Sequence, residues 1–211
     1  MPTLRAIVGF AVAAFALIVV PGPAVLYVVT RAIHQGRRAG VVSAAGIATA
    51  VIAHTAAAAF GLSALVARSG AAFTAMKVAG AAYMIVIGVR RLLSKSPALA
   101  LEDNPRPRSL LALYRQGFVV NLLNPKAALF FLAILPQFVD RHRGSTAKQV
   151  MVFGLIFAVI GLCSDSTWGF VAGTIGNRLR GDQRAQRALD RTSGAIFIGL
   201  GALALTAARP R

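Results

Sequence analysis

The sequence has little charge, and above all little negative charge. Only 14% of its 211 residues are charged and only 6 are acidic, whereas about a quarter of the residues of a typical soluble domain carry charge. A single cysteine, Cys163, excludes a disulfide framework and a CxxC metal or redox motif. The sequence also contains no HExxH or GxSxG motif, so we expect no enzyme and no bound metal or cofactor.

Apolar residues take the place of the missing charge. They make up 57% of the chain, and the mean hydropathy is +0.69. Long apolar runs cover residues 6–30, 40–66, 71–93, 112–139, 149–176 and 193–208. Each is near the roughly 20 residues that an α-helix needs to cross a bilayer, although the last is the shortest. The pattern predicts an all-α, multi-pass membrane protein with six transmembrane helices.

The first apolar run has an alternative interpretation as a secretory signal peptide, with Ile7–Val20 as its apolar core. The run continues past Pro23 to Thr30, which is longer than such a core usually is. We therefore expect it to form the first transmembrane span.

Basic residues are abundant, with 23 Lys and Arg, but their positions are typical of a membrane protein. All except Lys77 and Lys126 lie at the ends of the apolar runs or between them, where they meet anionic lipid headgroups. No interleaving of basic and aromatic residues suggests base stacking, so we expect no nucleic-acid partner. The connections after the first, third and fifth runs hold 14 of these cations, and the opposite side holds 7. The positive-inside rule therefore predicts that both termini lie outside the cytoplasm.

Two of the apolar runs are interrupted by proline. In the first run Pro21 and Pro23 flank Gly22, and in the fourth run Pro125 follows Asn124. A proline ring crowds the carbonyl four residues earlier and donates no hydrogen bond, so each helix must kink or unwind. Backbone groups freed in this way are costly in hydrocarbon and are tolerated where protein or a water-filled cavity covers them. The alternative is a simple packing kink, which is common in membrane helices.

The two halves of the chain carry matching motifs in the same order. The matches pair Val20–Ala24 with Leu122–Lys126, Gly46 with Gly154, Gly61 with Gly169, and Gly80–Tyr83 with Gly194–Phe197. Three spans per half return the chain to the opposite side of the membrane, so the second half is predicted to be inverted. We expect one repeat at 1–93, a proline-containing linker at 94–110 and a second repeat at 111–211. Inverted repeats are characteristic of secondary transporters, whose substrate site lies where the broken helices of the two halves meet.

Polar side chains inside the runs are the candidates for binding or coupling. Asp165 is the only acid within any run, and we expect it to bind a substrate ammonium or carry protons, or else to be a hydrogen-bonded structural carboxylate. Lys126 follows Pro125 directly. It is expected to bind a substrate carboxylate, to pair with Asp165, or to extend to the membrane interface.

Amides and a histidine complete the set of candidates. Asn121 and Asn124 are three residues apart, so their amides can share one face and satisfy the groups freed by Pro125. His54 titrates in a useful pH range, but a lone histidine among alanines is more often a structural hydrogen-bonding partner. Lys77 lies near the start of its run, and we expect it to extend to the interface. The glycines are expected to permit close helix contact; they are Gly46, Gly61, Gly80, Gly88, Gly154 and Gly169.

These motifs together resemble the LysE/RhtB family of bacterial amino-acid exporters. The likeness rests on Pro21–Pro23, the Gly46 to Gly61 segment, Gly80–Tyr83 and above all NLLNPKAALFFLAILPQFV (Asn121 to Val139), and it is strongest for the homoserine and threonine branch. It implies export of amino acids or related metabolites from the cytoplasm, driven by the proton gradient. Members often carry a Gly-Asp pair one turn into the second span, where this chain has Ala50–Val51.

The sequence therefore predicts a secondary transporter in the bacterial inner membrane. Its expected partners are a small zwitterionic amino acid such as homoserine or threonine, protons, anionic lipids and, in a homo-oligomer, further copies of the chain. The expected mechanism is alternating access. A passive channel and a scaffold protein without a substrate are the alternatives.

Overall fold

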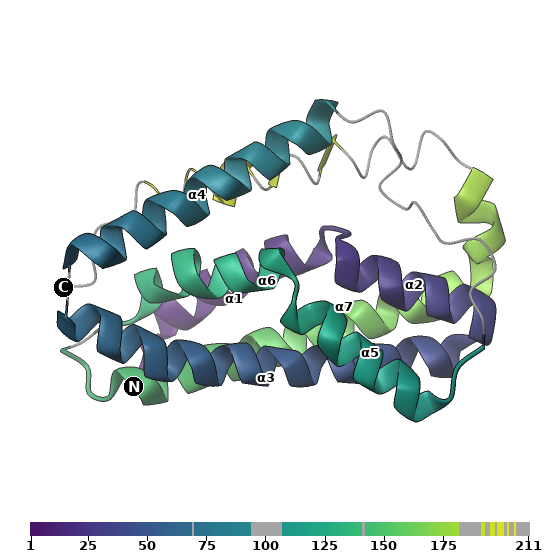
Figure 1. Cartoon of the computed structure of the whole chain (residues 1–211), viewed down its shortest axis with the longest axis horizontal. Coiled ribbons are helices and arrows are strands. Elements are labelled where there is room, and N and C mark those ends of the chain that lie inside the picture. Colours follow the sequence, from purple (N-terminus) through teal and green to yellow (C-terminus); the bar gives the residue numbers. More distant parts are fainter. Residues whose placement is uncertain are drawn as a thin grey trace.

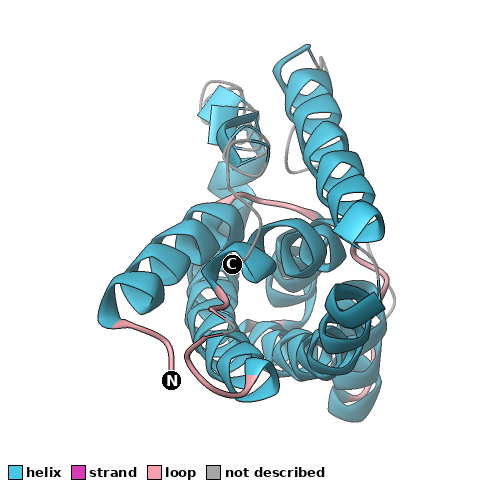
Figure 2. Cartoon of the chain, turned by 90° about the vertical axis from the view of Figure 1, so that its left-hand side faces the viewer, coloured by secondary structure: helices cyan, strands magenta, loops and turns pink. Residues whose placement is uncertain are grey.

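The computed structural model describes residues 1–68, 70–93, 107–140 and 142–181, together with residues 191–192, 195–196, 198–200, 202 and 205. Every regular element within these ranges is a helix, and there is no strand among them. Most of the helices run roughly along the long axis of the molecule (Figures 1 and 2). The all-α architecture is confirmed.

The first apolar run forms two helices, α1 (Leu4–Val19) and α2 (Pro23–Gln35), which meet at 54°. Val20 at the end of α1 is extended, Gly22 precedes α2, and Pro23 is the first residue of α2. Proline is favourable there because the first N–H of a helix has no partner within it. The predicted break is therefore present.

The second helix, α2, is longer than hydropathy predicts. It continues five residues beyond Thr30 to Gln35, and Gly36, whose φ of 84° favours glycine, caps its end. Arg31 consequently lies inside a helix and is buried, with 4% of its surface exposed. Hydropathy alone places this residue after the first apolar run, in a connection.

The fourth apolar run is broken in the same way. Helix α5 (Leu110–Leu122) is followed by α6 (Pro125–Leu129), and the segments meet at 47°. Beyond α6 the chain continues as a π-helical turn, η1 (Phe130–Ile134), and a 3₁₀ turn, η2 (Leu135–Phe138). Pro136 in η2 has no N–H for regular helical bonding, which accounts for this change of pitch.

Two long helices form the centre of the described structure. Helices α3 (Arg37–Arg68) and α7 (Thr146–Gly181) are long and apolar enough to cross a membrane, and they pack against each other. Counting each bent pair as one span gives up to four spans within the described ranges. The third apolar run, 71–93, forms the helix α4 (Gly70–Leu93), which lies along one side of the bundle (Figure 1) and contacts η1. The predicted sixth span, 193–208, and the linker at 94–106 lie largely outside the described residues.

Close helix contacts involve three of the glycines predicted for this role. At Gly169 on α7 a Cβ would lie 3.0 Å from Val28 Cγ1 and 3.3 Å from Gly40 Cα, and the other two are tighter still. A Cβ at Gly46 would collide with the backbone oxygen of Tyr114 on α5, and one at Gly154 would collide with the side chain of Thr55 on α3. Both positions therefore require glycine, as small-residue packing in membranes does generally. Gly61 lies in α3 and Gly80 and Gly88 lie in α4, but the packing around them and the side chain of Lys77 are not among the described features.

Phenylalanine side chains fill one end of the bundle. Phe10 of α1 lies 5.6 Å from Phe130 and 4.7 Å from Phe153 between ring centroids, and Phe157 of α7 lies 5.0 Å from Phe130. Phe10, Phe130 and Phe153 are fully buried. We call this group, with Phe131 and Phe138, the phenylalanine cluster; it joins α1, η1, η2 and α7 into one apolar core.

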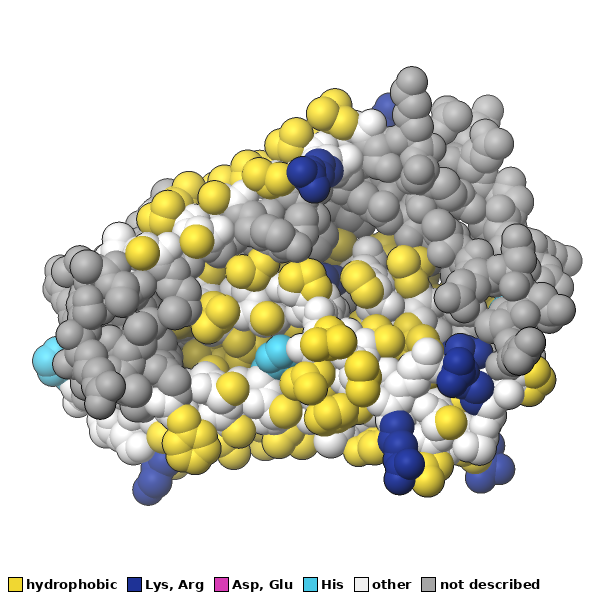
Figure 3. Space-filling view, viewed as in Figure 1, with side chains coloured by type: hydrophobic (Ala, Val, Ile, Leu, Met, Phe, Trp, Pro, Cys, Tyr) yellow, Lys and Arg dark blue, Asp and Glu magenta, His cyan; other side chains and the backbone are white. Residues whose placement is uncertain are grey.

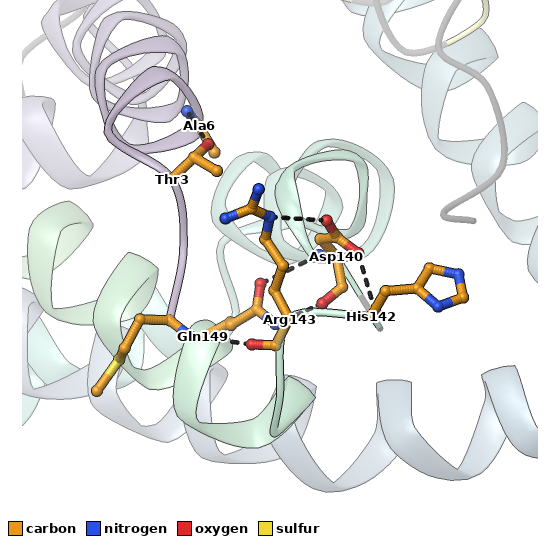
Figure 4. A network of polar contacts seen from close by, with 7 residues as sticks. Thr3, Ala6, Asp140, His142, Arg143 and Gln149 are labelled. Atoms are coloured by element: carbon orange, nitrogen blue, oxygen red, sulfur yellow. Dashed lines mark hydrogen bonds and ion pairs between the residues drawn. The ribbon is translucent and has the colours of Figure 1, made fainter.

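A polar network holds the N-terminus against the turn before α7. The terminal amine of Met1 donates to the Arg143 carbonyl at 2.9 Å, and Arg143 pairs with Asp140 at 3.4 Å (Figure 4). Gln149 of α7 both accepts from the Asp140 N–H and donates to its carbonyl. The chain start and the connection from η2 to α7 therefore lie at the same end of the bundle.

The outer surface carries many large apolar side chains. Phe15, Phe60 and Leu155 are 54%, 81% and 65% exposed, and apolar groups cover much of the described surface in Figure 3. Such a surface suits contact with lipid.

Candidate functional site

The two helix breaks meet in space. The Lys126 ammonium, one residue after Pro125, donates to the Val20 carbonyl at the end of α1, with 2.5 Å between Nζ and O. A Cβ at Gly22 would lie only 3.3 Å from Lys126 Cδ. The residues of the first break thus pack directly against the first turn of α6.

A small cavity of about 40 Å³ lies where the breaks meet. This is room for a few water molecules. Its walls come from both broken helices and from α3 and α7; the lining residues include Leu17, Ile18, Gly22, Val25, Ile47, Val51, Asn121, Asn124, Lys126, Phe157 and Asp165. Most of the lining is apolar, and the polar groups are concentrated in the last residues of α5, the second break, α6 and α7.

Asp165 and Lys126 bring opposite charges to this cavity. Asp165 lies on α7 and is 4% exposed, and it is the one carboxylate among the described residues that line the cavity. The two side chains are close enough to interact electrostatically. Lys126 therefore points inward at the cavity, and its expected alternative position at the membrane interface is not the one in the structure.

The two asparagines stabilise the second break. Asn124 Oδ1 accepts from the Lys126 N–H at 3.0 Å, which caps α6, and Asn124 Nδ2 donates to Asn121 Oδ1 at 3.3 Å. Asn121 Nδ2 donates in turn to the Ile47 carbonyl on α3 at 3.0 Å. Both amides are 4% exposed and line the cavity, so they lie on one face as predicted.

His54 supports the same break from α3. Its Nε2 lies 3.1 Å from the Asn121 carbonyl, which is the carbonyl that Pro125 deprives of its regular helical partner. A carbonyl oxygen only accepts, so Nε2 carries the hydrogen in this bond. The ring stacks on Phe131 at 5.9 Å. His54 thus contacts the break and is absent from the lining of the cavity.

A known family model covers nearly the whole of this architecture. The model described as the LysE type translocator matches residues 15–208. The chain belongs to this family. The resemblance inferred from the proline and asparagine motifs is therefore confirmed.

Similar curated proteins match the translocator over most of its length. A homoserine/homoserine lactone efflux protein of Salmonella typhimurium (strain LT2) is 30% identical over 187 residues, which is 89% of each chain. An uncharacterized membrane protein of Vibrio cholerae is 29% identical over 89% of this chain and 90% of its own. A further membrane protein, from Bacillus subtilis, is 26% identical over 88% and 91%. No solved structure matches the chain.

A second polar region of the translocator joins α2 to α5 and was not predicted from the sequence. Tyr27 donates to the Leu113 carbonyl at 3.0 Å, Arg31 donates to Gln116 Oε1 at 3.4 Å, and Gln35 donates to the Arg108 carbonyl at 2.8 Å. These three α2 residues are four positions apart and therefore share one face. We call them, with Gln116, the α2–α5 seam. The spacing becomes visible once α2 is known to extend to Gln35.

Proposed function

We propose that this translocator exports a small zwitterionic amino acid, such as homoserine or threonine, or a related metabolite, from the bacterial cytoplasm. The observation that carries the proposal is the meeting of two broken helices at one cavity that holds a carboxylate and an ammonium. Broken helices that meet around a site are the usual arrangement in secondary transporters. The efflux protein named in Salmonella supports the choice of homoserine-like substrates.

Each cavity residue has a proposed role. Asp165 binds the substrate ammonium or carries the coupled proton, and Lys126 binds the substrate carboxylate. Asn121 and Asn124 hold the second break in position and offer their amides to the substrate. His54 fixes the carbonyl of Asn121. Both helices are kept interrupted at the cavity by Pro21, Gly22, Pro23 and Pro125.

The carboxylate at the cavity lies on α7, whereas the family resemblance implies one on α3. Val51, at the position where the family resemblance implies an aspartate, lines the cavity from α3. Asp165 enters the same cavity from α7. We propose that Asp165 supplies the negative charge that α3 lacks, and that export is coupled to proton entry through it.

We infer that the whole chain is built as two inverted three-helix repeats, 1–93 and 111–211, joined by the linker at 94–110. The similar bends of 54° and 47° at the matched positions support this duplication. Six spans and the excess of Arg and Lys on one side put both termini outside the cytoplasm. Alternating access then moves the cavity between the two sides of the membrane. The site lies within one chain, so a homo-oligomer is compatible with it.

Transport by the purified protein tests the proposal. Proteoliposomes that hold homoserine or threonine at the same concentration inside and outside should export the amino acid, and so build up a gradient of it, when a proton gradient is imposed; an uncoupler should stop the export. A passive channel would only equilibrate the amino acid, and a scaffold protein would release none.

A further inference from the structure

Lys126 places its ammonium at the C-terminal end of a helix that belongs to the other break. The acceptor is the carbonyl of Val20, which follows the last turn of α1. Carbonyls at this end carry the negative partial charge of the helix dipole and favour a cation. The Asp165 carboxylate faces the same cavity. Val20 O and Asp165 thus form a position suited to an ammonium group.

The cavity is too small to accept an amino acid while the surrounding side chains keep their present positions. Its volume of about 40 Å³ suits a few water molecules. An amino acid can enter only if a side chain moves, and the Lys126 stem is the flexible element in the wall because four methylene groups separate its charge from the backbone. The stem runs beside Gly22, where the chain offers no side chain to hold it in place.

We propose that a substrate inserts between Lys126 and Asp165, and that its ammonium replaces the Lys126 ammonium in this position. This inference rests on the proposed export function. The substrate ammonium takes the position beside Val20 O and Asp165, and the Lys126 ammonium moves to the substrate carboxylate. The Val20 carbonyl becomes a ligand of the substrate, and Lys126 becomes the residue that requires the substrate to carry a carboxylate.

Charge balance makes this exchange selective. The pair of Lys126 and Asp165 is neutral in sum, and a zwitterion inserted between them leaves the sum unchanged. An amine without a carboxylate would bring an unbalanced positive charge into an apolar enclosure, which is costly. The enclosure therefore prefers zwitterions to cations of the same size.

Removing the charge of residue 126 should reverse this preference. We would compare homoserine and threonine with homoserinol and threoninol, in which a hydroxymethyl group replaces the carboxylate. Wild-type proteoliposomes should export the amino acids and not the amino alcohols. Lys126→Met should change the ratio of the export rates of amino alcohol and amino acid by about 100-fold in favour of the amino alcohol. The reason is that Asp165 is then left without a counter-charge and is balanced best by a cation. Lys126→Arg, which keeps the charge, should keep the wild-type preference.

The outcomes separate this inference from the proposed function. Export by the wild type together with an unchanged preference in Lys126→Met overturns the exchange and leaves the export function intact. A wild type that exports neither amino acid overturns both. Should Lys126→Met not fold, thermal stabilisation of the wild-type protein decides instead: protection by homoserine and not by homoserinol supports the exchange, and equal protection contradicts it.

Discussion

The two helix breaks differ in how their freed backbone groups find hydrogen-bond partners. The break after α1 consists of Val20, Pro21 and Gly22, which offer no polar side chain, and its Val20 carbonyl is bound by Lys126 from the other break. The break after α5 has its own cap in Asn124 and further support from His54. One break therefore contributes backbone acceptors to the cavity, and the other contributes side chains. Matching motifs in the sequence do not imply equal roles.

The largest effect is expected from the residue that faces both breaks. Asp165→Asn should lower gradient-driven export by about 100-fold or more, because Lys126 is left without a buried counter-charge at a cost of about 3–5 kcal/mol. Export would be measured in proteoliposomes, with size-exclusion chromatography to show that the protein is folded. Undiminished export would remove Asp165 from the mechanism.

A side chain at position 22, in the first break, should displace Lys126 of the second break and so disturb the contact between the two breaks. In Gly22→Val the new atoms would occupy the space of the Lys126 stem, since a Cβ already lies 3.3 Å from Lys126 Cδ. We expect export to fall about tenfold, as overpacking costs about 1–3 kcal/mol. Gly199→Val is the matched control, because a Cβ there meets nothing within 4 Å. Equal effects of the two substitutions would contradict the contact between the breaks.

His54 should affect the second break alone. His54→Phe keeps a ring to stack on Phe131 but loses the donor to the Asn121 carbonyl, and this carbonyl still accepts from the Asn124 N–H at 3.1 Å. The expected loss of stability is therefore about 1 kcal/mol, seen as a lower melting temperature in detergent. His54→Gln should recover most of it through its amide N–H. A role of His54 in proton coupling would instead appear as loss of export in His54→Gln.

The smallest effect is expected beyond both breaks, in the α2–α5 seam. Tyr27→Phe removes the hydroxyl that lies within hydrogen-bond distance of the Leu113 carbonyl and of Gln116 Oε1, and it leaves the bonds of Arg31 and Gln35 in place. We expect a loss of about 0.5–1.5 kcal/mol, measured by thermal unfolding, and homoserine export within about twofold of the wild type. A large loss of export would show that the seam belongs to the transport cycle.

The sequence predicts the features that depend on local chemistry. Proline and glycine determine where the helices break, and spacing places Asn121 and Asn124 on one face. Asp165 stands out because an acid inside an apolar run is rare. These inferences need no knowledge of the tertiary structure. The structure contains both breaks, places the two asparagines on one face and places Asp165 at the cavity.

Partners far apart in the sequence were not predictable in this way. Val20 and Lys126 are separated by 106 positions, and His54 and Asn121 by 67, so only the packing of α1, α3 and α6 brings them together. The length of α2 was also missed, because hydropathy marks the end of the apolar run and Gly36 marks the end of the helix. Arg31 was misplaced for the same reason.

The contact between the two breaks can be measured directly by solid-state NMR in lipid bilayers. Val20–Pro21 is the one Val–Pro step in the sequence, so labelling valine carbonyls with ¹³C and proline with ¹⁵N selects the Val20 carbonyl. Lysine labelled with ¹⁵N at the ammonium then reports its distance from this carbonyl. We expect a dipolar coupling to Lys126 that is absent in Lys126→Met and that weakens when homoserine saturates the protein. A transport-active protein without this coupling would contradict the account.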